Sequence, residues 1–338
     1  MELSFASRLE LHHDPVFVTT SRSPAVPARP TLYDVAVPAD LRQFGERVRA
    51  STLGDPANLP VVVLGGISAN CFPALRPDGA PGWWAGLAGE SRAINPSDHF
   101  IIGVDFAADE TGAAAPSTAD QARVLATALD TIGVDRPVVI VGASYGAMVG
   151  LALAEAEPSR VDRLVVISAA AEPHPQSTAA RELQRRVVSL GLQAGTGDEA
   201  LAIARGMAML TYRSPAEFEQ RFNGGIEEPA TLCCSDPGDY LRARGTAFRS
   251  VMSPERFLSL SASIDRHRIC AERILTPCLL IGAASDQLVY AEDMRRLAAS
   301  LAGPVELHLL DSLYGHDMFL KEAERVGTIV APFLATGE

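Results

Sequence analysis

Residues 137–154 constrain the fold of this chain more than any other segment. The continuous apolar run 137–141 (PVVIV) is followed by 142–146 (GASYG) and then by a helix-favouring run, 147–154 (AMVGLALA). A buried strand, a cramped turn and a helix in this order expose a serine hydroxyl, here that of Ser144, at the tip of the turn. The helix N-terminus behind it favours developing negative charge. We predict that Ser144 is a nucleophile; a plain tight turn is the alternative.

An acid and a base follow further along the chain. The apolar run 278–282 ends shortly before Asp286, and the run 305–310 ends shortly before His316. Both side chains would lie on loops after strands, where an α/β sheet places its site. Alone, Asp286 could cap a helix near 291–297 and His316 could be a surface histidine. The order Ser, Asp, His instead predicts a triad in which His316 takes the serine proton and Asp286 orients the imidazole.

An oxyanion site requires two backbone N–H donors. One is supplied by the residue after the serine, Tyr145, and the other by a loop after an early strand. Residues 60–64 (PVVVL) predict that strand, and 65–70 (GGISAN) form the loop. Ile67 is the candidate for the second N–H. A glycine-rich turn without a ligand is the alternative.

The order of strand-like and helix-like segments predicts an α/β fold. Apolar runs near 60–64, 100–105, 137–141 and 163–168 alternate with helix-like segments such as 120–132, which indicates a parallel sheet covered on both faces. A further strand is expected near 31–37, in a proline-rich stretch. Between about 172 and 274 we expect helices at 178–190, 198–210, 215–221 and 254–263 but no strand.

These segments together predict the α/β-hydrolase fold: a mostly parallel central sheet with helices on both faces and a helical lid insertion. The predicted organisation is core residues 1–171, a lid of residues 172–275, and core residues 276–338. A lid in this place would exclude water and add substrate contacts.

Charge and composition exclude several classes of function. The 338-residue chain has a net charge of −12 at pH 7, which argues against a nucleic-acid partner. An anionic ligand would need a local basic patch. Arg181, Arg185 and Arg186 form one candidate, although a solvated helix face is the expected setting for most of these arginines.

Cysteine usage and the absence of targeting signals predict a cytoplasmic location. The cysteines have no C-x-x-C spacing and are odd in number, which fits a reducing compartment and gives no metal site: Cys71, Cys233, Cys234, Cys270 and Cys278. The first residues lack the basic and apolar regions of a signal peptide, and no apolar run reaches the length of a membrane helix. We therefore expect no membrane partner and no bound metal.

Five separated segments resemble the homoserine O-acyltransferases of methionine biosynthesis, a branch of the α/β-hydrolase fold. They are 64–70 (LGGISAN), 82–84 (GWW), 161–168 (VDRLVVIS), 209–222 (MLTYRSPAEFEQRF) and 314–320 (YGHDMFL). The last two are rather specific, because general esterases do not carry them. The elbow departs from the family pattern at Ala143, Tyr145 and Ala147, where the family usually has glycine, methionine and glycine.

The resemblance implies roles for matching residues. Ser144, Asp286 and His316 match the triad, with the serine acylated by an acyl-coenzyme A. Arg205, seven residues before Tyr212, matches an arginine that with this tyrosine holds the amino-acid substrate, and Asp317 matches an aspartate that holds its ammonium group. A zwitterion requires one cation and one anion in its site. The alternatives are a helix-surface role for Arg205 and a loop cap for Asp317.

The resemblance therefore implies transfer of an acetyl or succinyl group from acyl-coenzyme A, as a co-substrate, to the hydroxyl of L-homoserine. It also implies a homodimer with small-molecule substrates and no permanently bound cofactor. Serine differs from homoserine by one methylene, worth only about 1–3 kcal/mol of discrimination, so a homoserine or serine O-succinyltransferase stays open. A serine esterase with the same triad and a non-catalytic binding protein are the alternatives from other classes.

Overall fold

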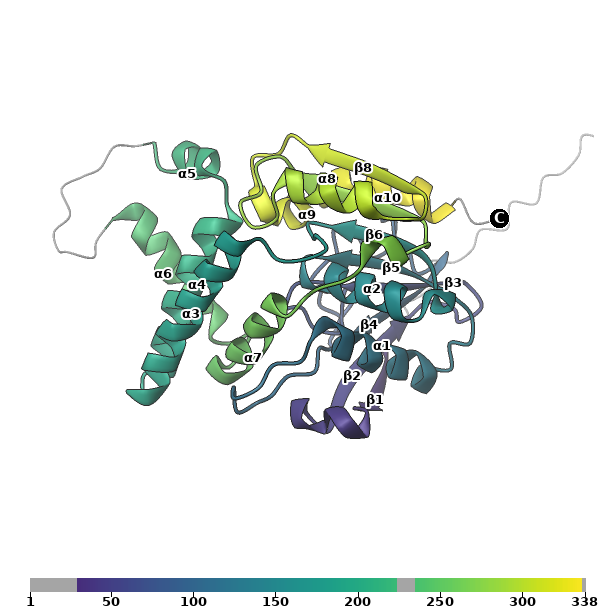
Figure 1. Cartoon of the computed structure of the whole chain (residues 1–338), viewed down its shortest axis with the longest axis horizontal. Helices are drawn as coiled ribbons and strands as arrows, with labels where there is room; N and C mark the ends of the chain where they lie inside the picture. Colours follow the sequence, from purple (N-terminus) through teal and green to yellow (C-terminus); the bar gives the residue numbers. More distant parts are fainter. Residues whose placement is uncertain (1–28, 224–234, 336–338) are drawn as a thin grey trace, which may run out of the picture.

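An eight-stranded sheet forms the centre of the computed structural model, which describes residues 29–223 and 235–335 (Figure 1). Its strand order is β1-β2-β4-β3-β5-β6-β7-β8. Strands β4, β3 and β5 to β8 are parallel, and β1 and β2 are antiparallel at one edge. The strands are β1 (Thr31–Ala36), β2 (Arg47–Leu53), β3 (Leu59–Leu64), β4 (His99–Val104), β5 (Val138–Ala143), β6 (Val161–Ile167), β7 (Cys278–Ala283) and β8 (Val305–Leu310).

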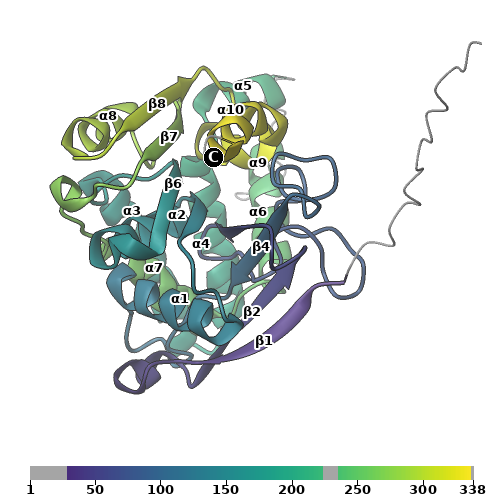
Figure 2. The same cartoon turned by 90° about the vertical axis from the view of Figure 1, so that its right-hand side faces the viewer.

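Helices cover both faces of this sheet, as predicted. Alternate residues of β5 enter two separate hydrophobic clusters, with Ile140 in one and Val139 in the other. The first cluster includes α1 (Thr118–Ile132), α2 (Tyr145–Ala156) and α8 (Ala291–Ser300). The second includes α9 (Met318–Lys321) and α10 (Ala323–Ala335). Figure 2 shows the sheet extending from β1 and β2 at one side to β7 and β8 at the other.

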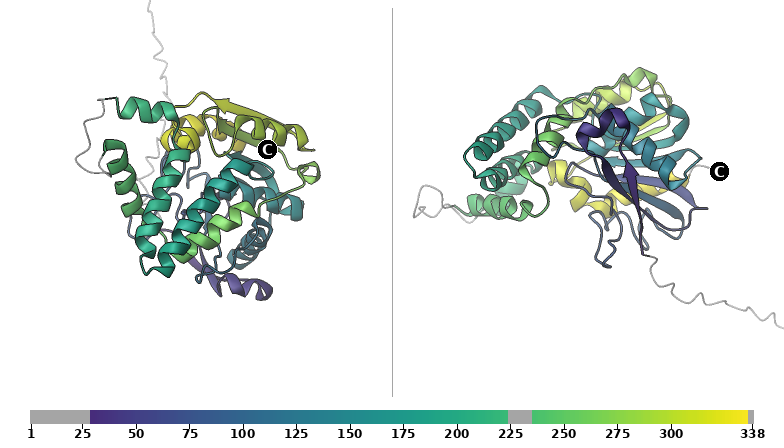
Figure 3. Two further views of the ribbon diagram at one scale, coloured as in Figure 1. Left: turned by 60° about the vertical axis from the view of Figure 1, so that its left-hand side comes forward. Right: turned by 90° about the horizontal axis from the view of Figure 1, so that it is seen from below.

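In the sequence, a block of helices follows β6 and precedes β7. This block projects to one side of the sheet (Figure 3). It contains α3 (Pro175–Gln193), α4 (Gly197–Tyr212), α5 (Pro215–Arg221), α6 (Asp236–Phe248) and α7 (Pro254–Asp265). Ser214 and Ser253 each accept a backbone N–H in the first turn of α5 and α7, and a proline follows each serine. This serine–proline start favours a helix. The division into core and lid stays a prediction.

Strand β2 and helix α6 are among the elements that were not predicted from the sequence. Strand β2 pairs antiparallel with β1 and β4, and its burial alternates from Arg47 through Ala50, a period-2 signal. Helix α6 has two glycines and a polar sequence, which lower its helix propensity. It is nevertheless held by packing against α4.

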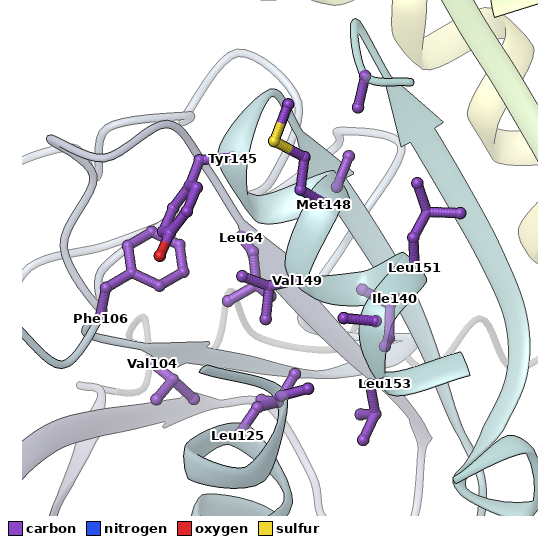
Figure 4. Packing of buried hydrophobic residues seen from close by; sticks show 14 of the residues in the cluster. Leu64, Val104, Phe106, Leu125, Ile140, Tyr145, Met148, Val149, Leu151 and Leu153 are labelled. Carbon is purple, nitrogen blue, oxygen red and sulfur yellow. The ribbon is translucent and has the colours of Figure 1, made fainter. Parts of the chain in front are cut away.

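Packing on the α1–α2 face fixes the position of the helix that follows the Ser144 turn. Figure 4 shows Leu64 and Ile140 from the sheet beside Val149 and Leu153 of α2, with Leu125 of α1 below them. These side chains are buried almost completely. Helix α2 is therefore held against β3 and β5, and the turn before it cannot shift without disturbing this core.

Candidate active site

Ser144 occupies a strained turn between β5 and α2. Its φ of 53° and ψ of −119° lie in a region that L residues rarely adopt. The flanking glycines permit the turn, because a Cβ on Gly142 would approach Ala147 Cα to 2.5 Å and a Cβ on Gly146 would approach the Leu64 backbone to 2.5 Å. The sequence thus brings strand and helix close together and exposes the serine at the tip, as predicted.

A hydrogen-bonded chain joins the three predicted triad residues. The Ser144 Oγ lies 2.9 Å from His316 Nε2, and His316 Nδ1 lies 2.8 Å from Asp286 Oδ2. The backbone N–H groups of Leu288 and Val289 donate to Asp286 Oδ1 at 2.8 and 3.1 Å. With the proton on Nδ1 shared with the carboxylate, Nε2 can accept the serine proton.

Asp286 does not cap the helix that follows it. Helix α8 begins at Ala291, and its N-cap residue is Tyr290. The carboxylate of Asp286 instead bonds to His316 and to the turn directly after itself. Asp286 and His316 are both buried, so His316 does not match the surface alternative considered from the sequence. Their catalytic role stays a prediction that activity measurements must test.

The electrostatic surroundings favour the charged form of His316. Burial lowers its pKa, but the charge and hydrogen bond of Asp286, with a smaller contribution from Asp317, outweigh burial and raise the pKa above its ordinary value of 6.5. An imidazolium that forms during proton transfer is therefore stabilised by the neighbouring carboxylates.

Two backbone N–H groups beside Ser144 have no acceptor in the part of the chain that the structure describes. Tyr145 is the first residue of α2, so its N–H has no intrahelical partner. Ile67 lies in the loop after β3, and this loop is tied to the elbow by a 2.8 Å bond from Gly146 N–H to the Gly65 carbonyl. The positions of Ile67 and Tyr145 suit the predicted oxyanion donors, and this role stays a prediction.

Two cavities flank the triad. Both are lined by Ile67, Ser144, Tyr212, Ile264 and His316. The first, which we call the Arg181 cavity, is also lined by Met148, Arg181, Gln184, Phe257, Ser261 and Leu288. The second, which we call the Arg205 cavity, is also lined by Gly66, Trp83, Arg205, Asp317 and Phe319. A nucleophile between two cavities can meet one substrate from each.

Arg205 supplies a cation to its cavity. It lies two helical turns before Tyr212 on α4, and its guanidinium sits 4.9 Å from the Tyr212 ring centroid and 4.6 Å from that of Phe248. Across residues 29–223 and 235–335, no carboxylate pairs with Arg205. The side chain is half-buried in the cavity wall, which differs from the helix-surface alternative. It is placed to bind an anion.

Asp317 enters the same cavity but is not an isolated anion. Its Oδ2 lies 3.0 Å from Arg213 Nη2, and Arg213 Nη1 lies 3.2 Å from Glu217. All three side chains are buried. Arg221 Nη1 also lies 3.8 Å from Glu217, so two guanidinium groups balance two carboxylates, and Asp317 is the carboxylate of this group that lines the cavity, where it can pair with a cationic group. Sequence reasoning missed Arg213 and Glu217, although their i, i+4 spacing was a usable signal.

The arginines of α3 depart from the expected solvated face. Arg186 is exposed. Arg181 and Arg185 are turned inward with 12% and 17% of their side chains exposed, and both pair with Asp265 at the end of α7. The expectation of a solvated face is therefore wrong for these two arginines. The helix α7 that supplies their partner packs against α3.

Other expected features can be placed only in part. Cys71, Cys270 and Cys278 are free thiols, and Cys233 and Cys234 lie outside the described residues. No cluster of three or more His, Cys, Asp or Glu side chains suited to a metal ion occurs in the described ranges. In those same ranges, no helix combines the length and apolar character needed to cross a membrane.

Comparison with known proteins gives one family model and several relatives. The model described as alpha/beta hydrolase fold matches residues 60–323. A homoserine O-succinyltransferase of Xanthomonas campestris pv. campestris is 36% identical over 310 residues, covering 90% of this chain and 84% of the relative. A homoserine O-acetyltransferase of Thermus thermophilus is 31% identical, covering 78% of this chain and 74% of the relative.

A solved structure, that of homoserine O-acetyltransferase from Bacillus anthracis, is similar in fold. Its TM-score is 0.79, with coverage of 91% of this chain and 97% of that chain. The sequence identity is 14%, so this similarity supports the fold alone.

Proposed function

From the premise that this chain belongs to the homoserine O-acyltransferases within the alpha/beta hydrolase family, we propose that it transfers an acetyl or succinyl group from acyl-coenzyme A to the hydroxyl of L-homoserine. One observation carries the proposal. The hydrogen-bonded chain Ser144–His316–Asp286 lies beside a cavity that presents both the Arg205 guanidinium and the Asp317 carboxylate. Those two charges suit the two ends of an amino acid.

The first half-reaction acylates the enzyme. His316 Nε2 takes the Ser144 proton while the serine oxygen attacks the thioester carbonyl carbon. The N–H groups of Ile67 and Tyr145 hold the oxygen on which negative charge develops. The C–S bond then breaks, His316 returns its proton to the departing thiolate, and coenzyme A leaves. Ser144 now carries the acyl group as an ester.

The second half-reaction transfers this group to the amino acid. Arg205 binds the carboxylate of homoserine, and Asp317 binds the ammonium. His316 removes the proton of the acceptor hydroxyl, which attacks the ester carbonyl in the same oxyanion site. The bond to Ser144 breaks, and the serine oxygen recovers a proton from His316. Binding the acceptor at both ends keeps its hydroxyl, rather than water, at the acyl-enzyme.

The cellular setting and assembly form part of the proposal. We infer a cytoplasmic enzyme of methionine biosynthesis that needs no resident cofactor and works as a homodimer. Support for the dimer comes from four exposed apolar side chains on α3 and α4, each more than half exposed: Leu183, Leu190, Ile203 and Leu210. Apolar groups gathered on two packed helices favour burial against another copy.

Release of the coenzyme A thiol tests this function. Purified protein receives acetyl- or succinyl-coenzyme A together with homoserine, serine or no acceptor, and Ser144→Ala serves as the control. We expect steady turnover only when an amino acid is present, and none above background in the control. Turnover that ignores the acceptor would indicate a thioesterase instead. Ester hydrolysis that is indifferent to changes at Arg205 and Asp317 would indicate the esterase alternative.

A further inference from the structure

A largely buried cluster with an excess of positive charge adjoins the Arg181 cavity, and its member Arg181 lines the cavity wall. Asp265 lies between two guanidinium groups, with Arg185 Nη1 at 2.7 Å from Oδ2 and Arg181 Nε at 2.7 Å from Oδ1. Two cations around one anion leave a net charge of about +1. The cavity that Arg181 lines is also the one that contains Ser144 and His316.

Arg181 retains a free donor group. Its Nε and Nη2 atoms are engaged by Asp265, and Nη2 also lies 3.3 Å from Thr178 Oγ1. Its Nη1 has no acceptor among the residues that the structure describes. Because Arg181 lines the cavity, this unused N–H group is available to hydrogen-bond an anion there.

Gln184 provides a second, independent observation. It lies one turn after Arg181 on the same face of α3, lines the same cavity, and is only 5% exposed. No hydrogen-bond partner of its side-chain amide occurs in residues 29–223 or 235–335. Its amide is therefore available to hydrogen-bond a polar ligand in the cavity.

Other charges on the cavity wall have partners of their own. Glu172 pairs with Arg268 at 2.8 Å, and Asp293 pairs with Arg296. Neither carboxylate is therefore available to neutralise the excess charge near Arg181. His174 also lines this wall and bonds to the backbone N–H of Gln176. The cavity beside the nucleophile thus favours an anion at its Arg181 end.

We propose that Arg181 and Gln184 bind a distal carboxylate on the acyl group, so that the preferred donor is a coenzyme A thioester of a dicarboxylic acid, such as succinyl-coenzyme A, rather than acetyl-coenzyme A. This inference rests on the proposed function. The phosphates of coenzyme A are separated from the thioester by the pantetheine arm, whereas Arg181 shares its cavity with Ser144. The acceptor carboxylate has its own cation, Arg205, in the other cavity.

Donor kinetics at fixed homoserine test the proposal. For the unmodified enzyme, kcat/KM with succinyl-coenzyme A should exceed that with acetyl-coenzyme A by about tenfold or more, the range of hydrogen bonds to a charged group. Gln184→Leu should lower the succinyl-to-acetyl ratio by about tenfold, and Arg181→Gln should lower it further. Arg186→Gln, an exposed arginine on the same helix, should leave the ratio unchanged.

The outcomes separate this inference from the proposed function. A preference for acetyl-coenzyme A, or an equal loss with both donors in the variants, would overturn the inference and leave the acyltransferase standing. A rise in the KM for homoserine at unchanged donor selectivity would also overturn it, by assigning Arg181 to the acceptor. No turnover with either donor would overturn both. Arg181→Lys, which keeps the charge beside Asp265, should recover part of the ratio and guards against misfolding of Arg181→Gln.

Discussion

The phenol hydroxyl of Tyr145 lies 2.5 Å from the hydroxyl of Ser263, which joins the nucleophile turn to helix α7 of the helical block. Both residues are buried, and the Tyr145 ring packs edge-on against Phe106 with centroids 4.8 Å apart. Ile264, the next residue on α7, lines both cavities. Tyr145, whose backbone N–H is a predicted oxyanion donor, thus also links the nucleophile turn to α7 through its side chain.

Removing the phenol oxygen should destabilise the fold without filling or emptying the core. Tyr145→Phe keeps the ring but leaves the Ser263 hydroxyl unpaired in a buried site, at a cost of about 1–3 kcal/mol in the free energy of unfolding. Urea unfolding measures this change. Tyr290→Phe is the matched control, because that hydroxyl bonds to Gln176 in an exposed setting and its loss should cost less than about 0.5 kcal/mol. Equal stability of both variants would contradict the account.

The raised pKa of His316 predicts the acid side of the pH profile. As the pH falls through that pKa, His316 gains a proton and can no longer accept one from Ser144, so kcat/KM should fall with a midpoint above 6.5. In Asp286→Asn the carboxylate that raises the pKa is gone and burial still lowers it, so the midpoint should move to lower pH. Turnover of the same variant should fall by about 10⁴-fold. A midpoint that does not move in this variant would exclude Asp286 as the cause.

The core of this fold was predictable because its strands are simple in sequence. Strands β3 and β5 are short apolar runs buried on both faces, and the loops after β7 and β8 carry Asp286 and His316. Periodicity and residue order suffice for such elements. Strand β2 is harder to recognise, because two arginines alternate with its buried residues at the edge of the sheet.

The charged partners in the site could not be predicted, because they depend on packing between distant segments. Asp265 lies 84 residues from Arg181, and Ser263 lies 118 residues from Tyr145. Nothing in the pattern around Arg181 indicates which face of α3 meets α7. The sequence therefore identified the residue types that the chemistry needs, and the structure supplies their neighbours.

Exposed apolar residues on α3 and α4 predict which substitutions would dissociate the proposed homodimer. Leu190 and Ile203 are 65% and 58% exposed, and a glutamate at either position would place a charge in an apolar interface. We expect Leu190→Glu and Ile203→Glu to give monomers in light scattering while the parent chain is a dimer. Leu275→Glu, at a 67% exposed position just before β7, should leave the dimer intact. If Leu275→Glu alone dissociated the dimer, the interface would lie elsewhere on the protein.

Substitution of the residues that bind the two ends of homoserine should weaken acceptor binding without slowing the acylation of Ser144. Arg205→Met removes the one cation of its cavity that has no carboxylate partner among the described residues, and Asp317→Asn removes half of the negative charge around Arg213. Each should raise the KM for homoserine by about tenfold or more, since each deletes a hydrogen bond to a charged group. Acylation of Ser144 without an acceptor, measured by intact-protein mass at a pH well above the His316 pKa, should keep its rate, because His316 is then neutral in each variant and no acceptor contact is used in that step. Arg295→Gln, an exposed arginine of α8, controls for loss of charge alone. Slower acylation in Arg205→Met would place this arginine with the donor and would reverse the assignment of the two cavities.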